Sequence, residues 1–285
     1  MRLNNELCYT VKHQYFYKVI QENDCFLPQM VKKIAQFIKF LNHFEVIHGD
    51  LRPANLIVEC DESYQNVTNV KVFNFASSFD ANDEQDGLGM RDVYFPEYAP
   101  PEILEYRNKV QNPVHKHEPK DSARGKREPN LEAEPKRENQ DLLDQYKGNI
   151  WAYDVWSLGV IMLEIATGCP IYIAKKAIII KAPEGRAAKD HQPTQPMMGK
   201  GLFGIESKQN HLNSLVVRQK LIVEKLKTSL SKCETYGIAD DRQFINLVTK
   251  MLELDPKKRI SPQGIINHPY CARQEGDKNT FTNVQ

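Results

Sequence analysis

The chain has 285 residues, of which 41% are hydrophobic and 26% carry a charge. This balance is typical of a globular protein and excludes a fibrous or wholly disordered one. Lys and Arg number 38 against 37 Asp and Glu, so the net charge of +1 provides no overall field for attracting nucleic acid or an anionic membrane. We therefore expect no nucleic acid and no membrane as a partner, because binding of a polyanion would need a local patch of positive charge.

The cysteines and the apolar segments indicate an intracellular protein, either cytoplasmic or nuclear. Six cysteines at positions 8, 25, 60, 169, 233 and 271 are too scattered for a disulfide framework, and no Cys-x-x-Cys pair suggests zinc. The first residues, Met1 to Asn5, lack the apolar core of a signal peptide. The most apolar run, Trp156 to Ile173, is interrupted by Glu164 and by Gly168-Cys169-Pro170, which favours a buried core helix over a membrane span.

In chain order, residues 1–26 form a mixed lead-in, and a helix follows. Its apolar positions recur every three or four residues, at Leu27, Met30, Val31, Ile34, Phe37, Ile38, Leu41 and Phe44. Pro28 suits the first turn of this helix. The segments 55–60 and 70–73 are then rich in residues that favour strands, and they flank a polar turn at 61–68, which predicts a β-hairpin.

The segment from Arg107 to Asp141 interrupts this order. It carries many charges of both signs and four prolines, with Val110, Val114 and Leu131 as its only larger aliphatic residues. Such a segment buries too little to offset the entropy lost on ordering, so we predict a disordered insertion. It is either a solvated linker or a docking or modification segment. The insertion would divide one domain into residues 27–106 and 142–270, and residues 271–285 would form a tail.

Helices dominate the second half. Residues 154–164 are apolar on nearly all sides, which is typical of a helix in the middle of a domain. Two further stripes with helical spacing follow, at Leu212, Leu215, Val216, Ile222, Val223, Leu226 and Leu230, and at Phe244, Leu247, Val248, Met251 and Leu252. We therefore predict a mainly α-helical fold with a small β-hairpin.

The octet from His48 to Asn55 lies between the first helix and the hairpin. It places Asp50 and Asn55 on a loop held by rigid elements, and an acid beside a carboxamide can bind magnesium or orient a hydroxyl group. The octet resembles the catalytic loop of protein kinases, His-Arg-Asp-Leu-x-x-x-x-Asn. Gly49 replaces the Arg of the family, and Arg52 replaces the Lys usual in serine/threonine kinases. The dipeptide Arg52-Pro53 nevertheless favours the serine/threonine pattern.

Four further segments are similar to kinase motifs and occur in the kinase order, so the resemblance covers about residues 27 to 270. They are Asn74-Phe75-Ala76 for the metal motif Asp-Phe-Gly, Tyr98 to Glu102 for Ala-Pro-Glu, Asp154 to Glu164 for the central helix, and Leu254 to Ser261 with His268-Pro269-Tyr270 for the end of the domain. One such match is weak evidence, whereas five in order are strong. The resemblance implies the C-terminal lobe of a kinase.

The resemblance also implies roles for single residues. Asp50 would be the general base toward a substrate hydroxyl, with the positive charge of Arg52 near the phosphate, or else a vestigial loop acid. Asn55 and Asn74 occupy the positions that bind metal and nucleotide in the family, although Asn55 also suits a residue that caps a strand by hydrogen bonding.

Structural roles are implied for five other residues. Asp154 would accept backbone hydrogen bonds from the catalytic loop, and Glu102 and Arg259 would form a buried ion pair. His48 and Phe75 would face the core.

Several departures from the family weaken the implied chemistry. The first glycine is Gly49, so no glycine-rich loop precedes the octet, and the 47 residues before His48 are too few for a five-stranded lobe. We therefore expect a C-terminal lobe that lacks the N-terminal β-lobe. Asn74 offers magnesium a neutral amide in place of a carboxylate, which lowers affinity for the metal. Gly199 to Gly204 spells Gly-x-Gly-x-x-Gly, but no strand leads into it, so we expect a flexible loop.

These features together predict a kinase-like protein that is catalytically inactive or strongly impaired and acts as a binding or scaffold module. It would use no cofactor, and it would bind a protein partner, or a second copy of itself, through the surface that an N-terminal lobe would cover. The alternative is a divergent serine/threonine kinase that uses ATP and magnesium to phosphorylate protein hydroxyls, with its N-terminal lobe missing from this chain.

Overall fold

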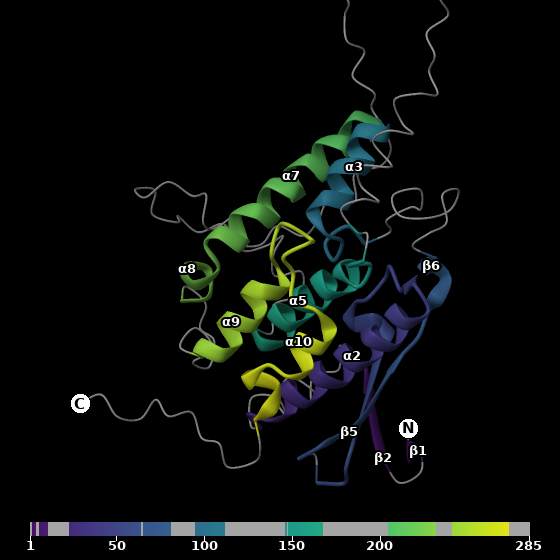
Figure 1. Ribbon diagram of the computed structural model, residues 1–285, viewed down its shortest axis with the longest axis vertical. Coiled ribbons are helices and arrows are strands. Elements are labelled where there is room, and N and C mark those ends of the chain that lie inside the picture. The colour runs from purple at the N-terminus through teal and green to yellow at the C-terminus, as the bar shows by residue number, and fades with distance from the viewer. Residues whose placement is uncertain are drawn as a thin grey trace, which may run out of the picture.

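The computed structural model describes residues 2–3, 6–10, 23–63, 65–80, 95–111, 146, 148–167, 205–231 and 241–273. Helices make up most of this part of the chain, and a small sheet lies beside one of them (Figure 1). The longer helices are α2 (Phe26–His43), α3 (Pro101–Gln111), α5 (Ala152–Thr167), α7 (Ile205–Glu224) and α9 (Arg242–Met251). Shorter ones are α8 (Leu226–Ser231), α10 (Pro262–Ile266) and the 3₁₀ helices η1 (Pro53–Asn55), η2 (Phe75–Ser77) and η3 (Pro269–Ala272).

Helix α5 is the centre of the core. Every residue from Ala152 to Ile165 is buried, as its uniformly apolar sequence predicts. Helices α2 and α9 pack against it, and Leu252 lies so close to Gly159 that a Cβ there would be 2.8 Å from a Leu252 methyl group. The loop that carries the octet therefore rests on the most rigid element of the fold.

Helix α2 begins one residue before the predicted start and has Pro28 in its first turn. Its buried face is the predicted stripe through Met30, Ile34 and Ile38, which packs against α5 and the sheet. The end of the helix leaves Phe40 and Phe44 exposed to solvent. The periodicity thus predicted the helix correctly but placed Phe44 on the wrong face, because it lies in the turn that ends the helix.

The predicted hairpin is formed by β4 (Leu56–Cys60) and β5 (Val67–Val72), which pair antiparallel with Leu56 opposite Val72. The lead-in adds two strands that we did not predict, β1 (Arg2–Leu3) and β2 (Glu6–Thr10), giving an antiparallel sheet in the order β1-β2-β4-β5. Strands of two and five residues are too short to give a clear alternating pattern. A second, two-stranded sheet of β3 (Val46–Ile47) and β6 (Phe79–Asp80) brackets the octet.

The prediction that disorder begins at Arg107 is wrong for its first five residues. Helix α3 continues to Gln111, and Arg107 and Asn108 are buried. These residues are ordered because α3 lies along α7, where Glu105 pairs with Lys220 and Asn108 donates a hydrogen bond to Asn213 (Figure 1). The rest of the predicted insertion, residues 112–141, lies outside the described residues, as do Gly199 to Gly204 and residues 274–285.

The side chains of three cysteines are described. Cys25, Cys60 and Cys271 are buried and form no disulfide with one another, and burial raises the pKa of Cys271 to about 12. Within the described part of the chain, none of the helices combines the length and the apolar character that crossing a bilayer requires.

Candidate active site

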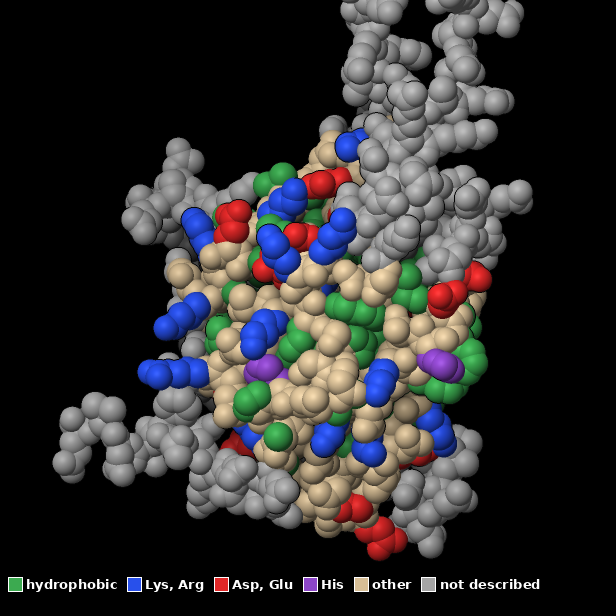
Figure 2. All heavy atoms as spheres, viewed as in Figure 1, with side chains coloured by type: hydrophobic (Ala, Val, Ile, Leu, Met, Phe, Trp, Pro, Cys, Tyr) green, Lys and Arg blue, Asp and Glu red, His purple; other side chains and the backbone are tan. Residues whose placement is uncertain are grey.

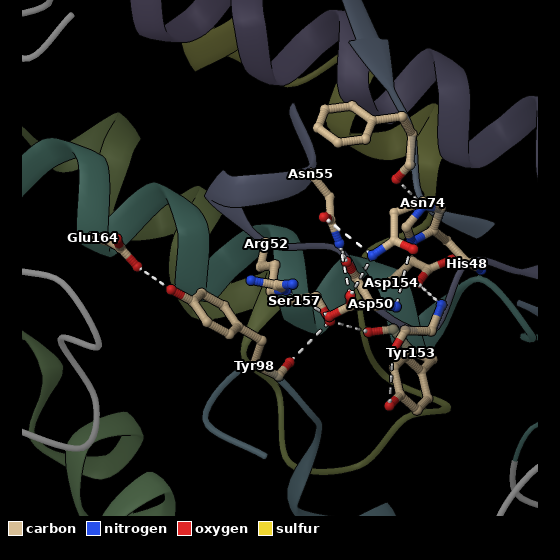
Figure 3. A network of polar contacts seen from close by, with 12 residues as sticks. His48, Asp50, Arg52, Asn55, Asn74, Tyr98, Tyr153, Asp154, Ser157 and Glu164 are labelled. Atoms are coloured by element: carbon tan, nitrogen blue, oxygen red, sulfur yellow. Dashed lines mark hydrogen bonds and ion pairs between the residues drawn. The ribbon is translucent and has the colours of Figure 1, made fainter. Parts of the chain in front are cut away.

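Asp154, in the first turn of α5, holds the beginning of the octet in place (Figure 3). The backbone N–H of His48 donates to Asp154 Oδ2 at 2.8 Å, and that of Gly49 donates to Oδ1 at 3.1 Å. The two carboxylate oxygens therefore fix two successive peptide groups. Asp154 thus accepts backbone hydrogen bonds from the loop, as the resemblance implied.

Burial raises the pKa of Asp154 above its ordinary value. His48 and the two backbone hydrogen bonds act in the opposite direction, because they stabilise the ionised form. Burial also raises the pKa of the neighbouring Tyr153, whose hydroxyl donates to the carbonyl oxygen of Gly49 at 3.4 Å. The base of the loop is thus a buried polar network with one carboxyl group at its centre.

Gly49 is required by the geometry of the loop. Its φ is +75°, in the left-handed region that side chains disfavour. A Cβ there would also lie 2.5 Å from the carbonyl oxygen of Ser77, which is backbone and cannot turn away. Glycine at this position is therefore part of how the octet packs against η2.

The two polar residues of the octet contact each other directly. Asn55 Nδ2 donates to the backbone oxygen and to the Oδ2 of Asp50, both at 2.7 Å. Arg52 Nε donates to Oδ1 of Asp50 at 2.9 Å. The Arg52 guanidinium carbon also lies 3.6 Å from the centre of the Phe95 ring. Both carboxylate oxygens of Asp50 are therefore engaged by side chains of the loop.

Asn74 joins this cluster from the end of β5. Its backbone is left-handed, with φ 68°, a conformation that Asn tolerates better than most residues. Its Nδ2 lies 3.3 Å from Asp50 Oδ2 and 3.4 Å from Asn55 Oδ1. The structure therefore brings together Asp50, Arg52, Asn55 and Asn74, the four residues for which the sequence suggested a catalytic or cofactor role (Figure 3).

This donor set fits magnesium poorly. The oxygens of Asp50 and Asn55 that could bind a cation already accept hydrogen bonds from the Asn74 amide, and Asp50 is the only carboxylate among the four residues. Magnesium prefers anionic oxygen ligands in octahedral geometry. Across the described ranges, no group of three or more His, Cys, Asp or Glu side chains is arranged to hold a metal ion.

His48 is buried as expected, with Nε2 at 3.2 Å from the carbonyl oxygen of Phe73. Phe75 does not face the core, and that expectation is wrong. Its ring contacts His48 edge-on at 5.0 Å and Phe37 at 6.2 Å, but 47% of the residue is exposed. The reason is that η2 carries Phe75 over the outside of α2, where the described residues supply nothing to cover its other face.

Glu102 and Arg259 form the ion pair that the resemblance implied. Arg259 Nη1 and Nη2 donate to the two Glu102 oxygens at 2.6 and 2.8 Å, and the Arg259 side chain is fully buried. The guanidinium also donates to the carbonyl oxygens of Ala152 and Glu253. Burial alone would lower the pKa of Arg259, but Glu102 raises it above its ordinary value, with Tyr146 contributing.

The sequence analysis assigned no role to four polar residues in this region. Tyr146 donates to Glu102, and burial raises its pKa strongly. Tyr98 donates to Glu164, while Ser157 donates to the backbone oxygen of Tyr98 at 2.9 Å (Figure 3). These contacts tie the segment before α3 to α5. Glu164 could have been found, because it is a carboxylate in an otherwise apolar helix.

Comparisons with known proteins agree with these motifs. A family model described as protein kinase domain matches residues 141–271. A mitogen-activated protein kinase of Caenorhabditis elegans, pmk-3, is 22% identical over 85% of this chain and 40% of its own length. The mitogen-activated protein kinase MKC1 of Candida albicans is 23% identical over 94% of the chain and 42% of its own length. A probable cyclin-dependent kinase 8 of Dictyostelium discoideum is 29% identical over 42% of the chain and 30% of its own length. The chain thus spans less than half the length of these curated relatives.

Proposed function

Because this chain belongs to the protein kinase family, we propose that it is a kinase-fold binding module in which phosphate transfer is lost or strongly impaired. The observation that supports this proposal is the position of the Asn74 amide, which donates to the oxygens of Asp50 and Asn55. A cation at this site would have to break these hydrogen bonds, and Asp50 would be its only carboxylate ligand among the four residues. Weak binding of the metal leaves ATP without the charge neutralisation that phosphoryl transfer needs.

The second candidate is a divergent serine/threonine kinase, and the comparisons favour it equally. Asp50 keeps its contact with Asn55, and Asp154 fixes the loop beneath them. In this candidate Asp50 would accept the proton of a substrate hydroxyl, and Arg52 would turn from Asp50 toward the phosphate. Residues that cover ATP would have to come from outside the described part of the chain.

Binding of magnesium and ATP separates the two candidates. We expect the melting temperature of the chain to change by less than about 1 °C with about 5 mM MgATP, because a ligand that does not bind the folded state cannot stabilise it. Asn74→Asp should restore a magnesium-dependent rise in melting temperature, because it adds a second carboxylate beside Asp50. The measurement is differential scanning fluorimetry with and without magnesium.

The matched control is Asn69→Asp on β5, which changes charge equally at an exposed position of the same hairpin. It should behave like the unmodified chain. A magnesium-dependent stabilisation of the unmodified chain by ATP would overturn the binding-module proposal and support the kinase.

A surface for the partner lies beside the site. Phe37, Phe40 and Phe44 follow one face of α2 at helical spacing, and Phe75 packs against Phe37; we name these four residues the aromatic surface. Phe40, Phe44 and Phe75 are 59%, 57% and 47% exposed. Exposed aromatic residues in a row on one helix match the apolar face of a second helix. We propose that the partner is another protein that presents an amphipathic helix here.

Substitution at the end of α2 tests this surface. A synthetic helical peptide of about 20 residues with leucines along one face should bind the chain, and Phe40→Ser with Phe44→Ser should weaken that binding about tenfold through the loss of apolar contact. Val217→Ser, at an exposed apolar position of α7, is the control, and fluorescence anisotropy is the measurement. A dimer in sedimentation velocity that the double variant abolishes would instead identify a second copy as the occupant.

A further inference from the structure

Four helices of the fold contain no acidic residue. Helix α2, the short helices α8 and α10, and helix α9 have neither Asp nor Glu in their sequences. They carry Lys32, Lys33 and Lys39 on α2, Lys227 on α8, and Arg242 and Lys250 on α9. The even balance of charge in the whole chain therefore conceals a segregation of charge in space.

These cations gather on one side of the molecule. Lys39 Nζ donates to Gln263 on α10 at 2.7 Å, which joins α2 to α10. Burial lowers the pKa of His268, and the nearby Lys250 lowers it further. Burial raises the pKa of Cys271, and the nearby Lys32 opposes this rise. Both lysines therefore lie close to η3, which α2 and α9 contact. Figure 2 shows Lys and Arg side chains over the middle of this view, where Figure 1 places α9, α10 and α2, with few acidic side chains among them.

Most of these cations have no carboxylate of their own. Exposed Lys39, Lys227, Arg242 and Lys250 form no ion pair with any described residue. Of the acidic residues nearest to these cations in sequence, two are paired with other cations and two lie next to the ends of the helices. Both oxygens of Asp241 bind Arg273, and Asp255 pairs with Lys258. The exposed Asp24 precedes α2 and lies close enough to Arg273 to help raise its pKa, and the exposed Glu224 ends α7 just before α8.

The exposed side of α9 is the middle of this surface. Arg242, Asn246 and Lys250 follow each other every four residues and so share one helix face about 12 Å long. Asn246 Oδ1 accepts a hydrogen bond from His268 Nε2 at 2.9 Å, while the Asn246 amide nitrogen has no partner among the described residues. The face thus offers two cations with a hydrogen-bond donor between them.

The chemistry favours one class of partner. Apart from Phe40 at the end of α2 and Phe44 just after it, the large exposed hydrophobic residues of the described structure lie outside these four helices. The part of the surface on α8, α9 and α10 therefore has no anchor for a bilayer and no aromatic platform for unpaired bases. A long polyanion would also interact with the rest of the chain, whose net charge is close to zero. A short acidic segment interacts mainly with charges within a Debye length, about 8–10 Å, so a local group of cations is enough to bind it.

We infer that the surface formed by Lys32, Lys39, Lys227, Arg242 and Lys250, the basic face, binds an acidic segment of another polypeptide. Carboxylates of such a segment would contact the cations, and the Asn246 amide would donate to its backbone. This binding does not depend on whether phosphate transfer is retained, because none of these residues belongs to the octet.

A polyglutamate peptide of about 20 residues tests the inference by fluorescence anisotropy. The chain should bind it at about 50 mM salt and lose most of that binding by about 300 mM, since screening weakens contacts between exposed charges. Lys227→Gln, Arg242→Gln and Lys250→Gln together should weaken binding at least about tenfold. Lys109→Gln, at an exposed position of α3, should not.

The triple variant should fold like the unmodified chain, because all three substituted side chains are exposed. Circular dichroism should therefore show an unchanged melting curve. Binding of duplex DNA or of phosphatidylserine vesicles more tightly than the peptide would overturn the inference in favour of those partners. Absence of peptide binding, or equal binding by the triple variant, would also overturn it.

Discussion

Replacing Glu102 with alanine is expected to lower the free energy of unfolding by about 3–5 kcal/mol, because it leaves a buried guanidinium without its counter-charge. Arg259 is 3% exposed and has no other carboxylate among its contacts in the described structure. Tyr146 loses its acceptor at the same time. Urea unfolding followed by circular dichroism measures the change.

Glu105 supplies the control, since it lies three residues away on the same helix. It pairs with Lys220, but the two side chains are 44% and 43% exposed. An exposed pair contributes about 0–1 kcal/mol, so Glu105→Ala should have a small effect. Equal effects of the two substitutions would show that the buried pair with Arg259 contributes no more to stability than a surface contact.

Replacing Asp154 with alanine should cost about 2–5 kcal/mol of stability. The N–H groups of His48 and Gly49 would lose their acceptors, and a buried unsatisfied group costs about 1–3 kcal/mol. The octet should also become mobile, which faster amide exchange at positions 48 and 49 would show. A variant that unfolds like the unmodified chain would mean that Asp154 does not support the loop.

Asp154→Asn separates hydrogen bonding from charge, because it keeps the shape and one acceptor. Burial raises the pKa of Asp154 in the folded state above 3.8, so the folded protein holds this proton to a higher pH than the unfolded chain does. The contribution of Asp154 to stability therefore falls as the pH rises from below 3.8 through the folded-state pKa. That part of the pH dependence should disappear in Asp154→Asn.

The elements that the sequence predicted well are long and periodic. The stripe of α2, the apolar run of α5 and the segments of the β4–β5 hairpin each repeat their pattern over enough residues to be distinctive. Strands β1 and β2 were missed because they become strands through pairing, β2 with β4 and β1 with β2, rather than through a pattern of their own. The end of α3 was missed because α7 buries it, and that contact joins segments about a hundred residues apart.

The candidate site, like the fold, was predicted only in part. Motif order indicated which residues meet, and Asp50, Asn55, Asn74 and Asp154 do lie together. Their functional roles remain predictions, which the MgATP experiment addresses. The direction in which the Asn74 amide donates and the outward position of Phe75 depend on the local course of the backbone around η2, which composition and spacing do not encode.

The close approach of Gly49 to the backbone of Ser77 makes the present form of the loop difficult to reverse. Any side chain at position 49, including the arginine usual in the family, would meet a carbonyl oxygen 2.5 Å from its Cβ and a backbone angle it disfavours. Gly49→Arg alone should therefore lower the stability of the folded chain. An arginine could be accommodated at position 49 only if η2 moved away from the loop, so the residue at this position and the course of η2 depend on each other.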